Sequence, residues 1–152
     1  HRMKDIIIYT DGAASPNPGR GGYGAVLISG NNKKEISQGF LHTTNNRMEL
    51  MSAIAALECL KHNNNDVTIY SDSKYVVDSV EKGWLHNWVA KNYKGVKNVD
   101  LWKRFLIAYN RQNVQFIWVK GHANNAGNER CDVLATTAAL SGNLIPDVGY
   151  QP

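Results

Sequence analysis

The sequence predicts an α/β fold, in which a mixed sheet of five strands is flanked by helices. Three runs of strand character follow one another closely near the start of the chain, which is typical of an antiparallel meander. Helical periodicity then alternates with short β-branched runs, and this alternation is typical of parallel neighbouring strands. The 152 residues suffice for one domain with a substantial core and are too few for two ordinary domains.

The antiparallel part is predicted from runs rich in β-branched and aromatic residues. The clearest run spans 5–10 and stops at Asp11 and Gly12. The stretch 12–22 is rich in Gly, Pro, Ser and Asn, so we expect it to be a loop. The second and third strands are expected at 23–29 and 35–41.

The rest of the chain alternates between helical and strand patterns. Apolar residues recur at helical spacing over 46–61, and either Thr44 or Asn45 could cap this helix. Further helices are expected at 73–82, 84–88, 101–111 and 125–140, and further strands at 67–71 and 114–119. We expect a loop at 91–98, one domain over 3–142 and a C-terminal tail over 143–152.

Composition argues against several classes of protein. The chain is 43% hydrophobic and 20% charged, and no apolar run approaches the roughly 20 residues that a membrane helix needs. Cys59 and Cys131 lie in helix-like segments and form no Cys-x-x-Cys pair, which argues against a disulfide scaffold or a zinc site. Reduced thiols and the lack of a secretory signal favour a cytoplasmic protein. His1 and Arg2 precede Met3, the expected natural start, and are interpreted as a cloning remnant or an alternative start.

Positive charge is concentrated in one part of the chain. The formal net charge is +4, but residues 82–111 contain seven basic residues and one acidic residue. That segment carries +6, whereas the remainder carries −2. A basic segment on a nearly neutral body suggests a polyanionic partner such as a nucleic acid, although a solvated lysine-rich surface would give the same pattern.

Four acidic residues occupy positions from which they could converge. Asp11 and Asp72 each follow a strand, and they would meet at one edge if these two strands are neighbours. Glu49 falls in the first turn of the first long helix, and Asp132 lies near the start of the last helix. Each of the four could instead serve local structure alone, as a turn residue, a helix cap, a partner of the helix dipole or a solvated helix residue.

Convergence of these carboxylates would require a cation. Four ionised carboxylates repel one another unless cations neutralise them, and hard oxygen ligands suit Mg²⁺ or Mn²⁺. Two such ions about 3.5–4 Å apart can activate a water molecule and stabilise the leaving oxygen of a phosphodiester. No cluster of Cys and His offers a zinc alternative. Convergence of the four acids would therefore indicate a divalent-metal nuclease, while their local structural roles stay open as alternatives.

Several long strings resemble the type 1 ribonuclease H family in its bacterial form. The strings are IYTDGAASPNPGRGGYGAV, TTNNRMELMSAIAALECL, YSDSKYV, LHNW, VKNVDLW, WVKGHANNAGNERCDVLA and the terminal GYQ. They occur in unbroken order from about Lys4 to Gln151, so the resemblance covers nearly the whole chain. It implies a five-stranded ribonuclease H fold and endonucleolytic cleavage of RNA paired to DNA, which leaves 3′-hydroxyl and 5′-phosphate ends.

The resemblance also implies roles for individual residues. The metal ligands would be Asp11, Glu49, Asp72 and Asp132, with Mg²⁺ as the cofactor and Mn²⁺ as a possible substitute. His122 would help to move protons or to release product, which suits an imidazole near neutral pH.

The same resemblance implies a minor-groove contact with the hybrid, where RNA displays 2′-hydroxyl groups and DNA does not. The implied hybrid contacts are Gly12, Asn17, Asn45 and Asn46, the implied contacts to a DNA phosphate are Thr44 and Asn87, and the implied DNA channel includes Trp84. We expect Trp102 and Trp118 to belong to the core instead.

Two features depart from the family pattern. Lys74 stands where many bacterial relatives have Gln, and its longer cation either adds a phosphate contact or has no role. The stretch 88–96 is shorter and less basic than in the best-known members, with only Lys91 and Lys94 inside it. Because each phosphate contact adds to the salt dependence of binding, we expect weaker or less salt-sensitive hybrid binding.

Two other functions compete with a monomeric enzyme that degrades hybrids. A non-catalytic module that binds hybrids or double-stranded RNA could use the basic segment, but it would not need all four acids. A transposase-like or resolvase-like DNA nuclease could share the fold, but the strings TTNNRMEL and GHANNAGNERCD do not support it.

Overall fold

The computed structural model describes residues 4–121 and 125–152, and it contains one mixed sheet with the strand order β5-β4-β1-β2-β3-β6. The strands are β1 (Asp5–Ala14), β2 (Gly19–Ser29), β3 (Asn32–Thr43), β4 (Asp66–Ser71), β5 (Asn113–Trp118) and β6 (Leu144–Ile145). The first three form an antiparallel meander, and the other pairings, β1 with β4, β4 with β5 and β3 with β6, are parallel. The predicted α/β class and mixed sheet are confirmed.

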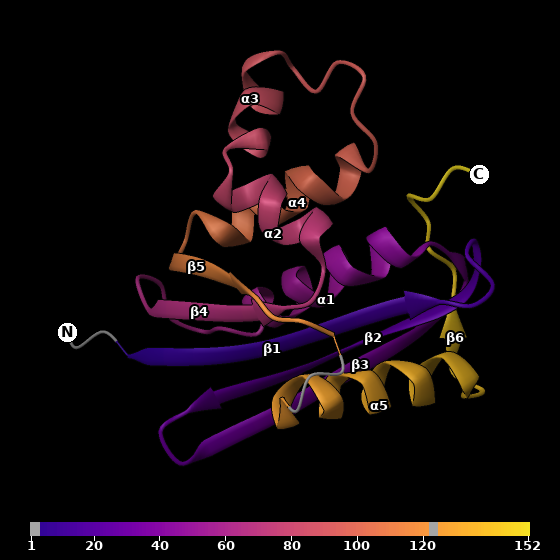
Figure 1. The fold of residues 1–152 in the computed structure, drawn as a ribbon, viewed down its shortest axis with the longest axis horizontal. Coiled ribbons are helices and arrows are strands. Elements are labelled where there is room, and N and C mark those ends of the chain that lie inside the picture. Colours follow the sequence, from indigo (N-terminus) through magenta and orange to yellow (C-terminus); the bar gives the residue numbers. More distant parts are fainter. Residues whose placement is uncertain (1–3, 122–124) are drawn as a thin grey trace.

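Helices cover the two faces of this sheet unequally. The helices are α1 (Asn45–Glu58), α2 (Lys74–Glu81), α3 (Trp84–Ala90), α4 (Val99–Tyr109) and α5 (Ala126–Leu140). Figure 1 shows the first four on one face, with α3 farthest from the sheet, and α5 alone on the other face. In the part of the chain that the structure describes, no helix has the length and apolarity needed to cross a membrane.

The sheet has six strands where five were expected. Residues 144–145 pair with Gly39 and Phe40 at the edge of β3, in the segment expected to be a tail. Two residues are too few to display an alternating pattern, so the sequence gives no signal for this strand. Beyond it, the side chain of Asp147 is only 3% exposed, which ties the C-terminal segment to the body of the protein.

The expected loop at 12–22 was mostly wrong. β1 continues to Ala14 and β2 begins at Gly19, so the turn between them is short. The glycines here serve close packing, because α5 lies directly against β2. A Cβ on Gly24 would lie 2.5 Å from Leu134 Cβ and 2.7 Å from the carbonyl oxygen of Cys131. Glycine in a strand therefore marks the approach of a helix here, and not a break in the strand.

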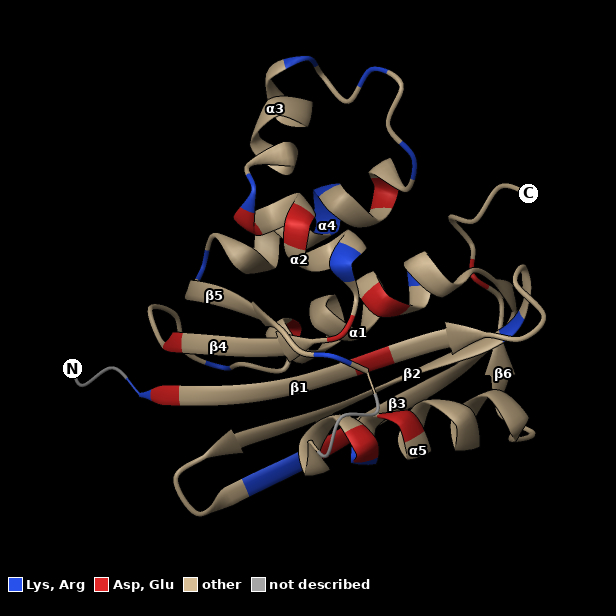
Figure 2. Cartoon of the chain, in the orientation of Figure 1, with Lys and Arg blue, Asp and Glu red and all other residues tan. Residues whose placement is uncertain are grey.

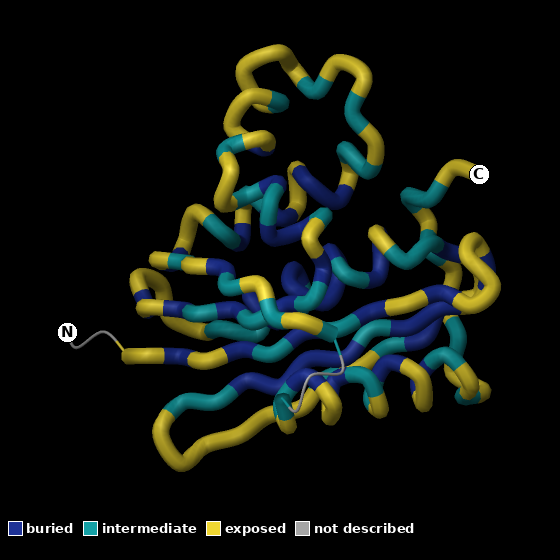
Figure 3. Tube along the Cα trace, viewed as in Figure 1, coloured by how far each residue is buried: buried dark blue, intermediate teal, exposed yellow. Residues whose placement is uncertain are grey.

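The core lies between the sheet and α1, α2 and α4, as the dark segments of Figure 3 show. Trp102 is fully buried, as expected. The expectation for Trp118 was wrong: it is 42% exposed, because it ends β5 at the edge of the sheet. Both Cys59 and Cys131 are free.

A buried ion pair fastens the C-terminal segment to the start of α1. Thr44 is the N-cap of α1, since its hydroxyl oxygen accepts a hydrogen bond from the backbone N–H of Arg47. The Arg47 side chain is 2% exposed, and its Nε donates to the Asp147 carboxylate at 2.7 Å. A second acid, Asp100 at the start of α4, accepts from the same guanidinium at 2.8 Å. One arginine thus joins α1, α4 and the C-terminal segment.

Replacing Arg47 with Met should lower the free energy of unfolding by about 3–5 kcal/mol, because it leaves Asp147 buried and unpaired. Urea denaturation followed by circular dichroism measures this loss. The matched control is Arg130→Met, which breaks the exposed pair with Glu35 and should change stability little. Equal effects of the two substitutions would contradict a structural role for the buried pair.

Candidate active site

Asp11 and Asp72 lie just beyond the point where the pairing of β1 with β4 ends. β1 and β4 pair in parallel up to Tyr9 and Tyr70. Beyond this point β1 continues beside β2, with Asp11 opposite Gly24, while β4 ends beside β5 and is followed by Asp72. Because the strands are parallel neighbours, their carboxyl ends bring Asp11 and Asp72 to one edge, as the topology predicts.

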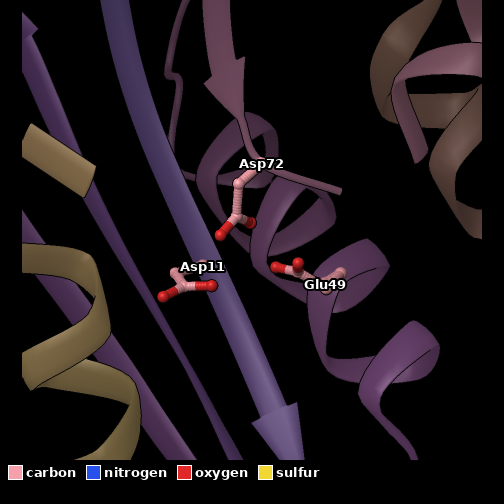
Figure 4. A group of neighbouring side chains, drawn as sticks. All are labelled: Asp11, Glu49 and Asp72. Atoms are coloured by element: carbon pink, nitrogen blue, oxygen red, sulfur yellow. The ribbon is translucent and has the colours of Figure 1, made fainter. Parts of the chain in front are cut away.

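The third acid reaches this edge because α1 lies close to β1. A Cβ on Gly12 would lie 2.4 Å from the carbonyl carbon of Met48 and 2.7 Å from the backbone nitrogen of Glu49. Only glycine permits this approach of helix to strand. The carboxylates of Asp11, Glu49 and Asp72 consequently point toward one another in Figure 4, and one oxygen of each lies within 4.8 Å of the others.

Burial and mutual repulsion perturb these carboxylates. Burial, followed by the charge of Asp72, raises the pKa of Asp11 to about 7. Burial, and then the charges of Asp11 and Asp72, raise the pKa of Glu49 well above its ordinary value. Glu49 Oε1 and Asp72 Oδ1 are buried and accept no hydrogen bond from the described residues. Buried carboxylate oxygens that lack a donor fit the ligand set of a hard divalent cation.

Asp132 lies at the margin of this cluster. It lines the same cavity of about 390 Å³ as the three acids, and its charge contributes to the raised pKa of Asp11. The described residues place it outside the tight group of three, on the half-buried face of α5. His122 lies outside the described residues.

A larger groove of about 810 Å³ adjoins the acid cavity, and Asn45 and Asn46 line both. Asn17 and Thr44, which the sequence predicts as hybrid contacts, also line the groove. The Asn17 Oδ1 accepts from the backbone N–H of Asn45 at 3.0 Å, and the Asn45 Oδ1 accepts from Ala14 N–H at 2.7 Å. Each carboxamide oxygen thus accepts a backbone hydrogen bond, and this orientation leaves the NH₂ group of each side chain as a donor for a ligand.

Of the other residues predicted to contact substrate, Lys74 lines the acid cavity, and the remaining four lie on or just beyond α3, apart from the acids. Trp84 and Asn87 are exposed on α3, and Lys91 and Lys94 are exposed just beyond it. Trp84 is 42% exposed, with the ammonium of Lys82 5.9 Å from its ring centre. Figure 2 shows Lys and Arg residues along the lobe from α3 to α4, while acidic residues mark the junction of β1, β4 and α1.

Comparisons with known proteins agree with this arrangement. Residues 3–140 match the model of the family described as RNase H. Ribonuclease H of Syntrophus aciditrophicus is 51% identical over 153 residues, covering 97% of this chain and 88% of that protein. Ribonuclease H of Pseudoalteromonas atlantica is 50% identical, covering 98% of this chain and 99% of that protein.

The chain belongs to the RNase H family. Among solved structures, LC9-RNase H1, described as a type 1 RNase H with the type 2 active-site motif, matches with a TM-score of 0.83 and 29% identity over 91% of this chain and 74% of that chain. LC11-RNase H1, solved in complex with an RNA/DNA hybrid, matches with a TM-score of 0.68 and 27% identity over 88% and 96%. The predicted resemblance to type 1 ribonuclease H is confirmed.

Membership of the RNase H family decides between the functions that the sequence left open. The chain is a ribonuclease H, an enzyme that hydrolyses the RNA strand of RNA–DNA hybrids. The prediction of a nuclease is confirmed, and a non-catalytic hybrid-binding module is the poorer description. Asp11, Glu49 and Asp72 are the group of described residues that could hold a metal ion.

Two parts of this RNase H site were missed from the sequence. The C-terminal residues 149–152 line the large groove beside Asn45 and Asn46, although this segment was expected to be a tail. Trp118 donates its indole Nε1–H to the carbonyl oxygen of Asp72 at 3.1 Å, although it was expected in the core. The strings that resemble the family held a signal for both, because GYQ occupies positions 149–151 and Trp118 is the first residue of WVKGHANNAGNERCDVLA.

Asp11→Asn should stabilise the metal-free protein near neutral pH. Folded Asp11 keeps its proton up to about pH 7, whereas the unfolded chain releases it near 3.8, so the stability of the wild type falls as the pH rises between these values. Asparagine does not titrate. In EDTA at pH 7.5, the melting temperature of the Asp11→Asn variant should therefore exceed that of the wild type by about 3 °C or more.

Thermal unfolding in EDTA at pH 4 and pH 7.5 measures this difference, which should be small at the lower pH. Added Mg²⁺ should stabilise the wild type more than Asp11→Asn. A variant that melts below the wild type in EDTA at pH 7.5 would contradict a cost of ionising Asp11 at this half-buried position beside Asp72.

Proposed function

We propose that Asp11, Glu49 and Asp72 hold Mg²⁺ for cleavage of the RNA strand, with Asp132 completing the site and Mn²⁺ as a substitute ion. One observation carries this proposal: three half-buried carboxylates present oxygens within 4.8 Å of one another, and two of their buried oxygens have no donor among the described residues. Such a group is stable in its ionised form only beside a cation.

Bound divalent ions would activate water and stabilise the developing charge on the scissile phosphate. The protein's own part is to fix the ligands before substrate arrives. β1 and β4 present Asp11 and Asp72, and the glycine contact beneath α1 holds Glu49 against them. Attack on the phosphate with departure of the 3′ oxygen leaves 3′-hydroxyl and 5′-phosphate ends.

The asparagines give a physical basis for selecting the hybrid. With their oxygens held by backbone N–H groups, Asn17 and Asn45 offer NH₂ donors to the acceptors of a minor groove. A 2′-hydroxyl accepts such a bond, and the DNA strand has none. Gly12 and Asn46 adjoin this donor pair in the acid cavity.

The DNA strand would lie across the groove and the lobe that carries α3. Thr44 at the N-terminus of α1 and Asn87 on α3 would hold one DNA phosphate, and Trp84 would contact a sugar or base. Lys91 and Lys94 add positive charge at the outer edge. His122, outside the described residues, would assist proton movement or release of product.

The decisive test is cleavage of labelled RNA–DNA hybrid, duplex DNA and duplex RNA, each with and without Mg²⁺ at roughly millimolar concentration. We expect the wild type to cut RNA in the hybrid, and to cut neither duplex DNA nor duplex RNA. Asp11→Asn should lose activity by roughly three orders of magnitude while remaining folded. Cleavage without added metal, or equal cleavage by the variant, would contradict the proposed metal site.

The contribution of the lobe is measured by the salt dependence of hybrid binding in EDTA. Removing both lysines with Lys91→Gln and Lys94→Gln should flatten the slope of log K against log salt by about two, roughly one for each phosphate contact. The control is the double variant Lys33→Gln and Lys34→Gln on the distant end of β3, which removes the same amount of charge. An equal change in the control would show that net charge, and not the lobe, determines binding.

A further inference from the structure

Lys74 is the basic residue among the described residues that line the acid cavity. It begins α2, two residues after Asp72, and its side chain is exposed. Its ammonium group lies 4.8 Å from the ring centre of Trp118. This distance is within the range of a cation–π contact, and tryptophan is the strongest partner for such a contact.

Trp118 is itself fastened beside the acids. It pairs with Ser71 at the end of β5, and its indole N–H donates to the carbonyl oxygen of Asp72 at 3.1 Å. The ring is nevertheless 42% exposed, so core packing does not account for its position. A tryptophan that is tied to the backbone of a carboxylate residue and lies beneath a lysine is a support for that lysine.

Without such a support, the Lys74 ammonium group and a divalent cation would compete for the same carboxylates. A lysine side chain two residues from Asp72 is long and flexible, and clustered carboxylates attract it strongly. An ammonium group among these carboxylates would compete with a divalent cation for the same oxygens. The ring of Trp118 offers an alternative position, in which the ammonium is stabilised and remains outside the cluster.

We propose that Trp118 is a positioning residue that keeps Lys74 off the carboxylates and holds it ready for a phosphate of the RNA strand beside the cleavage site. This inference rests on the proposed metal site formed by Asp11, Glu49 and Asp72. When the hybrid binds, the ammonium moves from the ring to the phosphate, which is the stronger partner because it carries a full charge.

Metal binding without substrate tests the first half of the proposal. Isothermal titration with Mg²⁺ or Mn²⁺ compares wild type, Trp118→Leu, Lys74→Gln and the double variant. Trp118→Leu should weaken metal binding by roughly three- to fivefold, as for a partly exposed ion pair that must be broken. The double variant should recover the affinity of Lys74→Gln, because no cation remains to compete.

Trp118→Phe separates this role from the hydrogen bond to Asp72. Phenylalanine keeps a ring for the ammonium but lacks the indole N–H, so its metal affinity should stay near that of the wild type. Thermal unfolding of each variant establishes that it is folded at the temperature of titration. If Trp118→Leu leaves metal affinity unchanged, or if its loss persists in the double variant, the proposal is overturned.

The salt dependence of hybrid binding tests the second half. With Ca²⁺ in place of Mg²⁺, Lys74→Gln should flatten the slope of log K against log salt by about one. An unchanged slope would overturn the phosphate contact. These failures are distinguishable from failure of the metal site itself, in which wild type and Asp11→Asn would bind metal equally.

Discussion

Mutual repulsion among half-buried carboxylates is the constraint on which the rest of this structure depends. One carboxylate oxygen of each of Asp11, Glu49 and Asp72 lies within 4.8 Å of the others, and burial, followed by their mutual repulsion, raises the pKa of Asp11 and of Glu49. The scaffold must hold them there by packing alone, because their own interactions push them apart. The parallel pairing of β1 with β4 and the close approach of α1 to β1 supply this restraint.

Three local features provide this restraint: a glycine in β1, the N-cap of α1 and an ion pair in the first turn of α1. Gly12 allows the backbone at Met48 and Glu49 to lie against β1, and a side chain at that position would force the helix away. Thr44 caps α1 one turn before Glu49, and Arg47 fastens the same turn to Asp147. The first turn of α1, which directly precedes Glu49, is therefore fixed from both sides, and this limits how far Glu49 can retreat from its like-charged neighbours.

Features with a regular pattern could be predicted from the sequence, and features that depend on distant partners could not. Strand and helix periodicity gave the order of elements, and strand ends followed by Asp11 and Asp72 indicated where acids would meet. The glycines of β2 were interpreted as a loop, since composition cannot tell a turn from a strand that α5 approaches closely. Trp118 was expected in the core because apolar aromatic character alone does not reveal an edge position.

Two buried charge systems in this protein are organised in opposite ways, and the contrast explains their functions. Arg47 and Asp147 neutralise each other internally and share well-aligned hydrogen bonds, so they stabilise the fold without need of a ligand. Among the described residues that line the acid cavity, Lys74 is the one basic side chain, and its ammonium group lies over the ring of Trp118. A protein built for stability alone would place that lysine among the acids. Keeping it outside leaves the negative charge available for an external cation, which is the condition for a metal-dependent site.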